Sequence, residues 1–290
     1  MEWKTDWGLR GRMVLTGFLL FALYIVFGAV VLELGYGGML IFMVPFLFAQ
    51  FFFSDKLALY SMGAHEVSEE EYPDLHRTIT RLSQQADLPK PKVAVADSRV
   101  PNAFATGRSQ KNSAVCVTTG LLRTLDDEEL EGVLAHELAH IKNRDVMVMT
   151  IASFLSTVAF IIVRWGWLFG GGDNRGGNQA PVLVAIVVSL VVWIVSFLLI
   201  RLLSRYREFA ADRGGAAISG KPGALASALI TIDSGMERVP QEDLRDTAEM
   251  NAFFVIPIKS GFVGKLFSTH PSTEKRVERL RELEREFESA

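Results

Sequence analysis

The sequence predicts a mainly helical membrane protein, with four membrane-spanning helices and a polar region that contains a small β-sheet. The composition and the apolar segments lead to this fold class. Hydrophobic residues make up 49% of the 290 residues and the mean hydropathy is +0.24, which is high for a soluble protein. Four apolar segments approach the roughly 18 to 20 residues that cross a bilayer as a helix. The net charge of −3 indicates no nucleic-acid partner.

The first two apolar segments predict an N-terminal hairpin in the membrane, residues 1–54. The segment Met13–Leu32 follows three basic residues, as in a signal peptide. Its apolar core is too long for one, however, and no small-residue cleavage site follows, so we expect it to be retained. The second segment, Tyr36–Phe53, is short and contains Pro45 and Gln50, so whether it crosses the whole bilayer stays open.

Residues 55–145 are expected to hold the small sheet. The apolar runs Val93–Ala96 and Val115–Thr118 have the composition of short strands. Segment 102–107 lies between them and, from its flanking proline and glycine alone, is an ordinary loop-to-strand segment. Cys116, the one cysteine, lies in an apolar run without basic neighbours, so we expect a buried thiol and no disulfide.

The most informative motif is HELAH, from His136 to His140. Residues four apart lie on one face of a helix, so both imidazoles can reach one metal ion, and Glu137 can face a water at that metal. Apolar residues at helical spacing around the motif predict an amphipathic helix with Thr124 as its N-cap. The alternative is a surface helix with two incidental histidines.

The third and fourth apolar segments, Val146–Val163 and Pro181–Ile200, predict a second hairpin in the membrane, residues 146–200. The loops inside the two hairpins contain one basic residue, Arg175, whereas the other polar parts of the chain hold nearly all the rest. Because basic residues concentrate on the cytoplasmic side, we expect both termini and both large polar regions to be cytoplasmic.

Two acidic residues after the fourth apolar segment could complete the metal site. Glu208 and Asp212 are four apart and share a helix face, so Glu208 can bind the metal while Asp212 holds a ligand histidine. If the helices continue straight out of the bilayer, His140 and Glu208 lie about 9 and 12 Å above it. The alternative is a charged helix end with both acids solvated.

Three motifs together carry a family resemblance: HELAH, REFAAD at 207–212 and THPST at 269–273. They resemble the HtpX-type integral membrane zinc metalloproteases, relatives of the CAAX prenyl proteases among the gluzincin-type peptidases. The segments PNAFATG at 101–107 and TTGLL at 118–122 also match, and the resemblance covers nearly the whole chain. It implies a cytoplasmic zincin-like metalloprotease domain formed by residues 55–145 and 201–290.

The resemblance also implies roles for individual residues. One Zn²⁺ per subunit would be held by His136, His140 and Glu208, and Glu137 would act as the general base. His270 would donate to the developing oxyanion or cap the metal at rest, although by itself it is equally a turn histidine before a proline.

For substrate binding, the resemblance implies an edge strand that pairs with an extended peptide, formed by Asn102, Ala103, Phe104 and Ala105. Residues 272–288 are expected to form a charged amphipathic helix that packs on the protease domain. Arg276 in this helix is a candidate partner for an acid in the site.

The predicted function is therefore a membrane-anchored zinc endopeptidase in the cell membrane, acting on membrane proteins or unfolded polypeptides in quality control and stress response. An intramembrane protease is disfavoured because charged residues flank HELAH on both sides. Four spans are too few for the chamber of a CAAX-type prenyl-protein peptidase. A silent membrane scaffold or chaperone is disfavoured by the intact Glu137. The oligomeric state and the natural substrate are not predicted.

Overall fold

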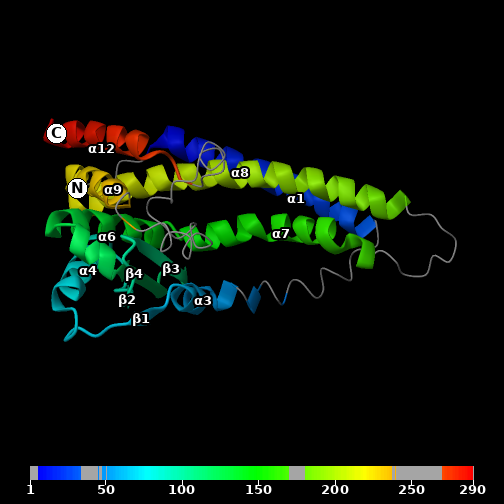
Figure 1. The fold of residues 1–290 in the computed structure, drawn as a ribbon. Coiled ribbons are helices and arrows are strands. Elements are labelled where there is room, and N and C mark those ends of the chain that lie inside the picture. Colours follow the sequence, from blue (N-terminus) through cyan, green and yellow to red (C-terminus); the bar gives the residue numbers. More distant parts are fainter. Residues whose placement is uncertain are drawn as a thin grey trace. The chain divides into compact units, whose positions relative to one another are not determined.

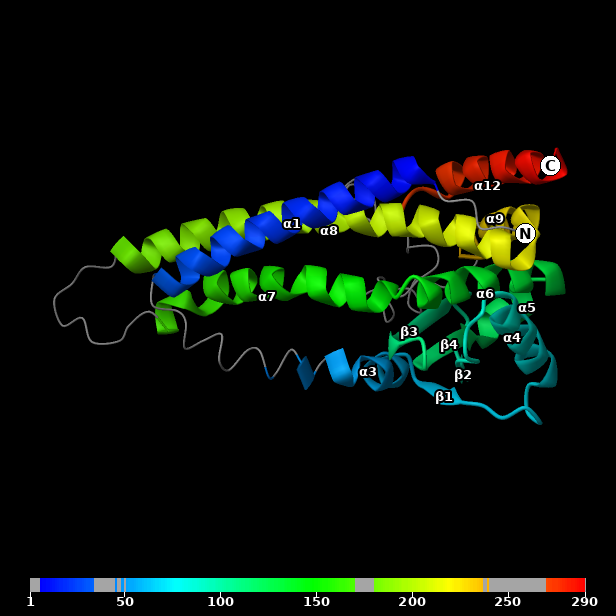
Figure 2. The ribbon, with the colours of Figure 1, turned by 180° about the vertical axis from the view of Figure 1, so that it is seen from behind.

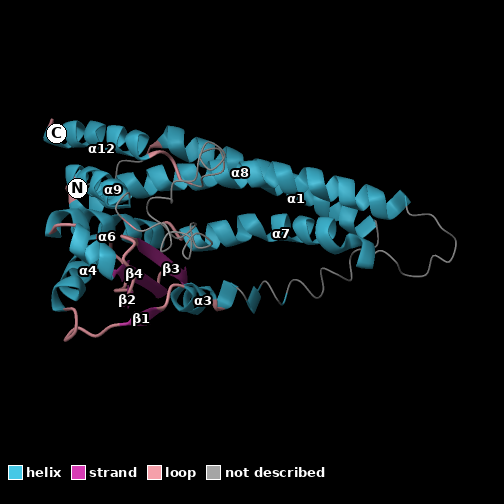
Figure 3. Ribbon diagram, in the orientation of Figure 1, coloured by secondary structure: helices cyan, strands magenta, loops and turns pink. Residues whose placement is uncertain are grey.

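The structure is a computed structural model that describes residues 6–33, 45, 48–49, 51–169, 180–236, 239 and 270–289. The chain is mainly helical with a small mixed sheet (Figures 1 and 3). The elements are α1 (Trp7–Glu33), α3 (Ser54–Ser61), β1 (Ala64–Glu66), α4 (Pro73–Gln85), β2 (Lys92–Ala96), β3 (Ala103–Ser109), β4 (Asn112–Thr118), α5 (Thr119–Thr124), α6 (Asp127–Lys142), α7 (Asp145–Phe169), α8 (Ala180–Ser219), α9 (Pro222–Met236) and α12 (Thr273–Glu288).

The chain divides into two compact units. The first, here called the sheet unit, comprises Met1–Thr5, Phe53–Val146 and Arg205–Ala290. The second, the apolar-helix unit, comprises Asp6–Phe52 and Met147–Ser204. Every residue of the predicted metal site lies in the sheet unit, so each unit can be described by itself.

The sheet of the first unit has the strand order β1-β2-β4-β3. β2 and β4 run parallel, and the outer strands pair antiparallel to them. The two inner strands are almost entirely buried, which explains why they are short apolar runs in the sequence. β3 lies at the edge of the sheet and contains Ala103, Phe104 and Ala105 of the predicted edge strand, whereas Asn102 precedes it.

Helix α6 lies at the centre of the sheet unit. It packs against α9, against α4 and against β3, and the view from behind in Figure 2 shows α4 and the strands beside it. All residues from Glu131 to Ala139 are buried, so the prediction of an amphipathic helix with one exposed face was wrong. Neighbours on several sides, rather than a hydrophobic stripe, explain this burial.

The start of α6 also differs from the prediction. The N-cap is Asp126, whose carboxylate accepts a hydrogen bond from the Glu129 N–H at 2.8 Å, while the Glu129 side chain accepts from the Asp126 N–H. This reciprocal pair is a capping box. Thr124 instead ends the preceding helix α5 and bonds to the Gly120 carbonyl within it.

The end of α6 contradicts the assumption that His140 lies on a helix continuing straight out of the membrane. The helix stops at Lys142, and α7 begins at Asp145 after a turn in which Arg144 has a φ of 56°. His140 is therefore not on a helix that continues straight from the third apolar segment. For Glu208 the assumption of a continuous helix is correct, because α8 is one helix from Ala180 to Ser219.

The apolar-helix unit contains parts of the three helices that are long and apolar enough to span a membrane among the described residues: Trp7–Glu33, Asp145–Arg164 and Leu183–Ser219. Large apolar side chains point outward from them, with Phe18 and Phe21 of α1 both more than 60% exposed. Such faces are unfavourable in water and suit a lipid environment. The predicted second span, Tyr36–Phe53, lies mostly outside the described residues.

Candidate metal centre

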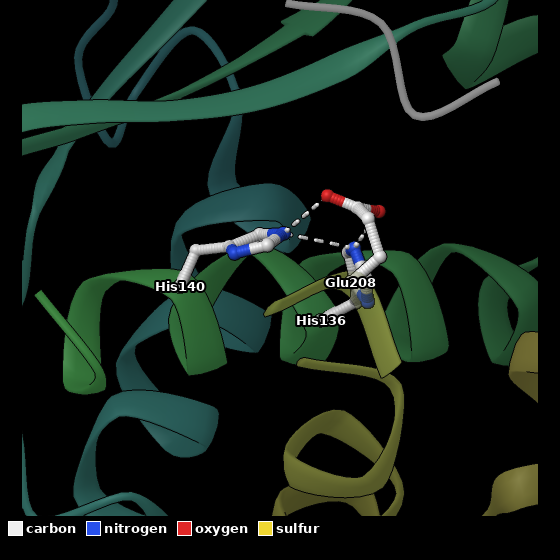
Figure 4. Close-up of side chains that lie close together, drawn as sticks. All are labelled: His136, His140 and Glu208. Atoms are coloured by element: carbon white, nitrogen blue, oxygen red, sulfur yellow. Dashed lines mark hydrogen bonds and ion pairs between the residues drawn. The ribbon is translucent and has the colours of Figure 1, made fainter. Parts of the chain in front are cut away.

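The structure brings the three predicted metal ligands together. His136 and His140 come from α6 and Glu208 from α8, and Figure 4 shows the three side chains pointing toward one another. The Nε2 atoms of the two histidines are 3.1 Å apart, and Glu208 Oε1 lies 3.5 Å from the His140 Nε2. One ligand atom from each residue lies within 4.8 Å of the others. This is the arrangement that the four-residue spacing on α6 predicted.

The chemistry of the cluster fits a divalent cation. Two imidazole nitrogens and a carboxylate oxygen are ligands that zinc binds in catalytic sites. Oε2 of Glu208 is buried without a well-directed hydrogen bond within the described part of the chain, and His270 Nδ1 and Arg276 Nη1 lie 3.2 and 3.5 Å from it. A metal ion bound at the cluster would give this buried carboxylate a direct positive partner.

The Nδ1 side of His136 is held by an acidic residue, as predicted. Asp212 Oδ1 lies 3.0 Å from the His136 Nδ1, and both side chains are almost fully buried. Burial alone lowers the pKa of His136, but the carboxylates of Asp212 and Glu208 outweigh it and raise the pKa to about 9. A metal ion that binds at Nε2 therefore has to displace a proton.

Arg276 of α12 binds the carboxylate of Asp212. Its guanidinium donates from Nε to Asp212 Oδ2 at 2.9 Å and from Nη2 to Oδ1 at 2.6 Å, and only 1% of the residue is exposed. Nη1 also lies 3.5 Å from Glu208 Oε2. Burial disfavours the charged guanidinium, but the nearby carboxylates prevail and raise the pKa of Arg276. The predicted pairing of Arg276 with an acid of the site is therefore present in the structure.

His140 has an acidic partner that the spacing of residues in the sequence does not predict. Asp145, at the start of α7, lies with Oδ2 2.6 Å from the His140 Nδ1, and Arg207 Nε lies 2.8 Å from its Oδ1. Asp145 follows His140 by five residues, which is not a same-face spacing in a helix, so periodicity gave no signal. The available signal was an acid directly after the polar turn that ends the motif helix.

Two other predicted site residues lie beside the cluster. His270, just before α12, has its Nδ1 3.2 Å from Glu208 Oε2, and its side chain is 9% exposed. Glu137 is buried on α6 next to the first ligand, with 4% of the residue exposed. His270 therefore contacts a candidate ligand, Glu137 is buried in the helix that carries the two histidines, and neither is a solvated surface residue.

The predicted substrate strand lies beside the motif helix. Ala103, Phe104 and Ala105 belong to β3, which packs against α6, while Asn102 directly precedes the strand and is buried. The Asn102 N–H donates to Thr118 Oγ1, and its carbonyl accepts from the Thr118 N–H, so the start of β3 is fixed to β4. The edge position agrees with the geometry that strand addition requires.

The cysteine and the two histidines outside the motifs have no part in the cluster. Cys116 is buried in the sheet, and burial raises the pKa of its thiol to about 12, so it is no nucleophile. Of the two histidines outside the motifs, His65 is exposed, whereas His76 is buried, with its Nε2 3.1 Å from the Val67 carbonyl.

The close approach of α8 to α6 depends on a glycine. A Cβ added at Gly215 would lie 2.8 Å from the His136 amide nitrogen and 2.9 Å from its Cα. Both neighbours are backbone atoms and cannot rotate away. Gly215 therefore allows the helix that carries Glu208 to lie against the helix that carries the histidines.

Comparisons with known proteins agree with this geometry. Residues 69–284 match the model of peptidase family M48. The chain is 54% identical over 294 residues to protease HtpX homolog 2 of Methanosarcina acetivorans and 53% identical over 291 residues to a protease HtpX homolog of Moorella thermoacetica, with at least 97% of each chain covered.

A solved structure adds evidence on the fold. The crystal structure of Ste24p from S. mikatae is similar with a TM-score of 0.56 and 17% sequence identity, over 89% of this chain and 62% of that chain. The chain thus spans less than two thirds of that protein, and the likeness concerns the fold alone. The family match and the full-length relatives, taken with the assembled cluster, show that the chain belongs to peptidase family M48 and, within it, to the HtpX-type membrane metalloproteases.

Proposed function

We propose that the chain is a membrane-anchored zinc endopeptidase that hydrolyses peptide bonds of membrane proteins or unfolded polypeptides on the cytoplasmic side, in quality control and stress response. The observation that carries the proposal is the convergence of His136, His140 and Glu208 from two helices, with Glu137 buried in the same helix as the histidines. The M48 family is one of metallopeptidases, which supports a metal at this cluster.

In this proposal His136, His140 and Glu208 hold one Zn²⁺ per subunit, and Asp212 and Arg276 keep His136 oriented. When bound, zinc would lower the pKa of a water molecule and polarise the scissile carbonyl. The Glu137 carboxylate takes a proton from the attacking water and passes it to the leaving amine. His270 donates a hydrogen bond to the developing oxyanion.

We further propose that β3 receives the substrate. An extended peptide would add to the edge beside α6 through main-chain hydrogen bonds along Ala103, Phe104 and Ala105, while Asn102, whose main-chain groups bond to Thr118, fixes the start of that edge. Main-chain pairing tolerates many side chains, which suits a peptidase that clears damaged proteins of varied sequence.

The membrane arrangement is part of the same proposal. The three apolar helices of the described chain, with Tyr36–Phe53 as a fourth span, would form two hairpins, residues 1–54 and 146–200. Both termini and the two protease regions, 55–145 and 201–290, would then be cytoplasmic. The near absence of basic residues from the predicted outer loops supports this orientation.

The test uses the full chain in vesicles, with zinc content and cleavage of an unfolded polypeptide measured together. Glu137→Gln should retain zinc and lose cleavage about 10²- to 10⁴-fold, because it removes the base and no ligand. Glu128→Gln is the matched control, since Glu128 is an exposed acid of the same helix that pairs with Lys221, and it should cleave normally.

Two outcomes would refute parts of the proposal. Cleavage by Glu137→Gln at the normal rate, with zinc present, would disprove the assignment of the base. Full zinc occupancy in Glu208→Ala would disprove the third ligand. A prenylated C-terminal peptide serves as a second substrate, and its exclusive cleavage would favour a prenyl-protein peptidase instead.

A further inference from the structure

Asp145 is placed to fix the orientation of the second ligand histidine. Its Oδ2 accepts a hydrogen bond from the His140 Nδ1 at 2.6 Å, and the carboxylate is 3% exposed. An ionised carboxylate only accepts hydrogen bonds, so the Nδ1 carries a proton, and in the neutral imidazole the Nε2 then keeps the lone pair that a metal needs. The Nε2 faces Glu208 and His136 (Figure 4).

The backbone between α6 and α7 makes this contact possible. In a continuous helix, residues five apart point about 140° away from each other, so Asp145 could not reach His140. The helix stops at Lys142, and Arg144 adopts a φ of 56°, a left-handed conformation that is unfavourable for a residue with a Cβ. The turn redirects the chain so that Asp145 lies against the imidazole.

Arg207 holds the other oxygen of the same carboxylate. Its Nε lies 2.8 Å from Asp145 Oδ1, and 7% of the residue is exposed. The guanidinium compensates the buried negative charge of Asp145, which would otherwise be very unfavourable. Arg207 also directly precedes Glu208 in α8, so the contact connects the support of one ligand to the element that carries another.

The two ligand histidines thus have supports of the same kind from different parts of the chain. His136 contacts Asp212, which Arg276 of α12 binds. His140 contacts Asp145, which Arg207 of α8 binds. In each case an aspartate faces the Nδ1 of the imidazole and an arginine fixes the aspartate. The first support was expected from sequence spacing, and the second was not.

We propose that Asp145 and Arg207 are positioning residues that act through His140 and set the affinity and geometry of the metal site. The proposal rests on the proposed function, because it assumes that His140 is a metal ligand. Partners that orient a ligand histidine typically change metal affinity by about 10- to 100-fold when they are removed.

The experiment measures zinc affinity by chelator competition on the purified full chain, together with the visible spectrum of the cobalt-substituted protein. Asp145→Asn should weaken zinc binding about 10- to 100-fold and change the cobalt spectrum, because the amide can donate to Nδ1 and allow the wrong tautomer. Arg207→Gln should weaken it less, and Arg207→Lys should restore part of the loss by returning the charge.

The matched control is Glu131→Gln. Glu131 is a mostly buried acid of the same helix α6 with its own arginine partner, Arg81, at 2.9 Å. Loss of this pair should leave zinc affinity and the cobalt spectrum within twofold of the parent. An equal loss of affinity in Glu131→Gln would mean that any break in a buried ion pair loosens the site, and it would overturn the proposal.

A double variant tests whether the two residues act together. The combined Asp145→Asn and Arg207→Gln changes should weaken zinc binding no more than Asp145→Asn alone, because Arg207 acts through the carboxylate. Additive losses, or an Asp145→Asn protein with parental affinity, would overturn the proposal. If Asp145→Asn fails to fold, the comparison of Arg207→Lys with Arg207→Gln decides the same question.

These readouts separate the proposal from the proposed function. A parent chain that binds one zinc ion without cleaving peptides would refute the peptidase assignment and leave the positioning roles testable by affinity. A parent chain that binds no zinc at this cluster would refute both.

Discussion

At the residue scale, the site depends on charges that are buried together. Asp212, Glu208 and Arg276 are each less than 7% exposed and lie within ion-pair distance across two elements. A buried charge is tolerated only when its partner remains, since the penalty for removing charges from water is several kcal/mol for each ion. The arginine is therefore a structural requirement of the metal-free protein as well as a support for a metal ligand.

The first prediction concerns this arginine. Arg276→Gln should destabilise the metal-free protein by about 3–5 kcal/mol, because it leaves two buried carboxylates without their counter-charge. Denaturant unfolding of the full chain in the presence of a chelator measures the change. Lys275→Gln, an exposed neighbour in the same helix, should change the free energy of unfolding by less than about 0.5 kcal/mol. Equal stability of the two variants would contradict the prediction.

The second prediction concerns a single missing side chain. Gly215→Ala places a methyl group 2.8 Å from the His136 amide nitrogen, so α8 has to move away from α6. We expect a loss of zinc affinity together with a stability loss of about 1–3 kcal/mol from overpacking. Gly17→Ala in α1, with no neighbouring atom within 4 Å, is the control and should be neutral or slightly stabilising. Unchanged zinc binding in Gly215→Ala would show that the close approach is dispensable.

At the element scale, α6 begins with a capping box formed by neighbouring residues, and it is buried by elements from distant parts of the chain. Its capping box and acidic first turn are local features that stabilise a helix wherever it lies. Its burial by α9, α4 and β3 depends on segments far apart in the sequence. The capping box therefore stabilises the helix, and the surrounding elements determine which of its residues reach the site.

The third prediction distinguishes the two possible starts of this helix. Asp126→Ala should destabilise the protein by about 1 kcal/mol, since it removes the acceptor for the Glu129 N–H. Thr124→Ala should have a smaller effect, because its hydroxyl bonds only within α5. Thermal unfolding of both variants tests the order, and a larger loss in Thr124→Ala would restore the N-cap predicted from the sequence. Zinc affinity should be unaffected in either variant.

At the scale of the whole molecule, the metal cluster and its support come from three stretches of chain, the first two of which are separated by membrane-length apolar helices. The histidines precede α7, Glu208 follows the apolar part of α8, and Arg276 comes from α12 near the C-terminus. The proposed topology has both proposed protease regions on one side of the membrane, which the distribution of basic residues also predicts.

The fourth prediction tests this topology. The native cysteine, Cys116, is buried, and its pKa is raised to about 12, so a membrane-impermeant maleimide should not label the parent protein. A cysteine introduced at Asp173 should be labelled only from outside the cell, and one at Lys275 only after the cytoplasmic side is opened. Labelling of Asp173→Cys solely from the cytoplasmic side would reverse the proposed orientation.

The sequence by itself determined the membrane character, the motif helix, the three candidate ligands and Asp212, because helical periodicity and hydropathy are local properties. The tertiary structure decided what local patterns cannot express. The left-handed turn at Arg144 brings Asp145 to His140, Gly215 allows α8 to approach α6, and neighbours on several sides bury the motif helix. These features depend on backbone direction and on contacts between distant segments, and for that reason they leave no periodic signal in the sequence.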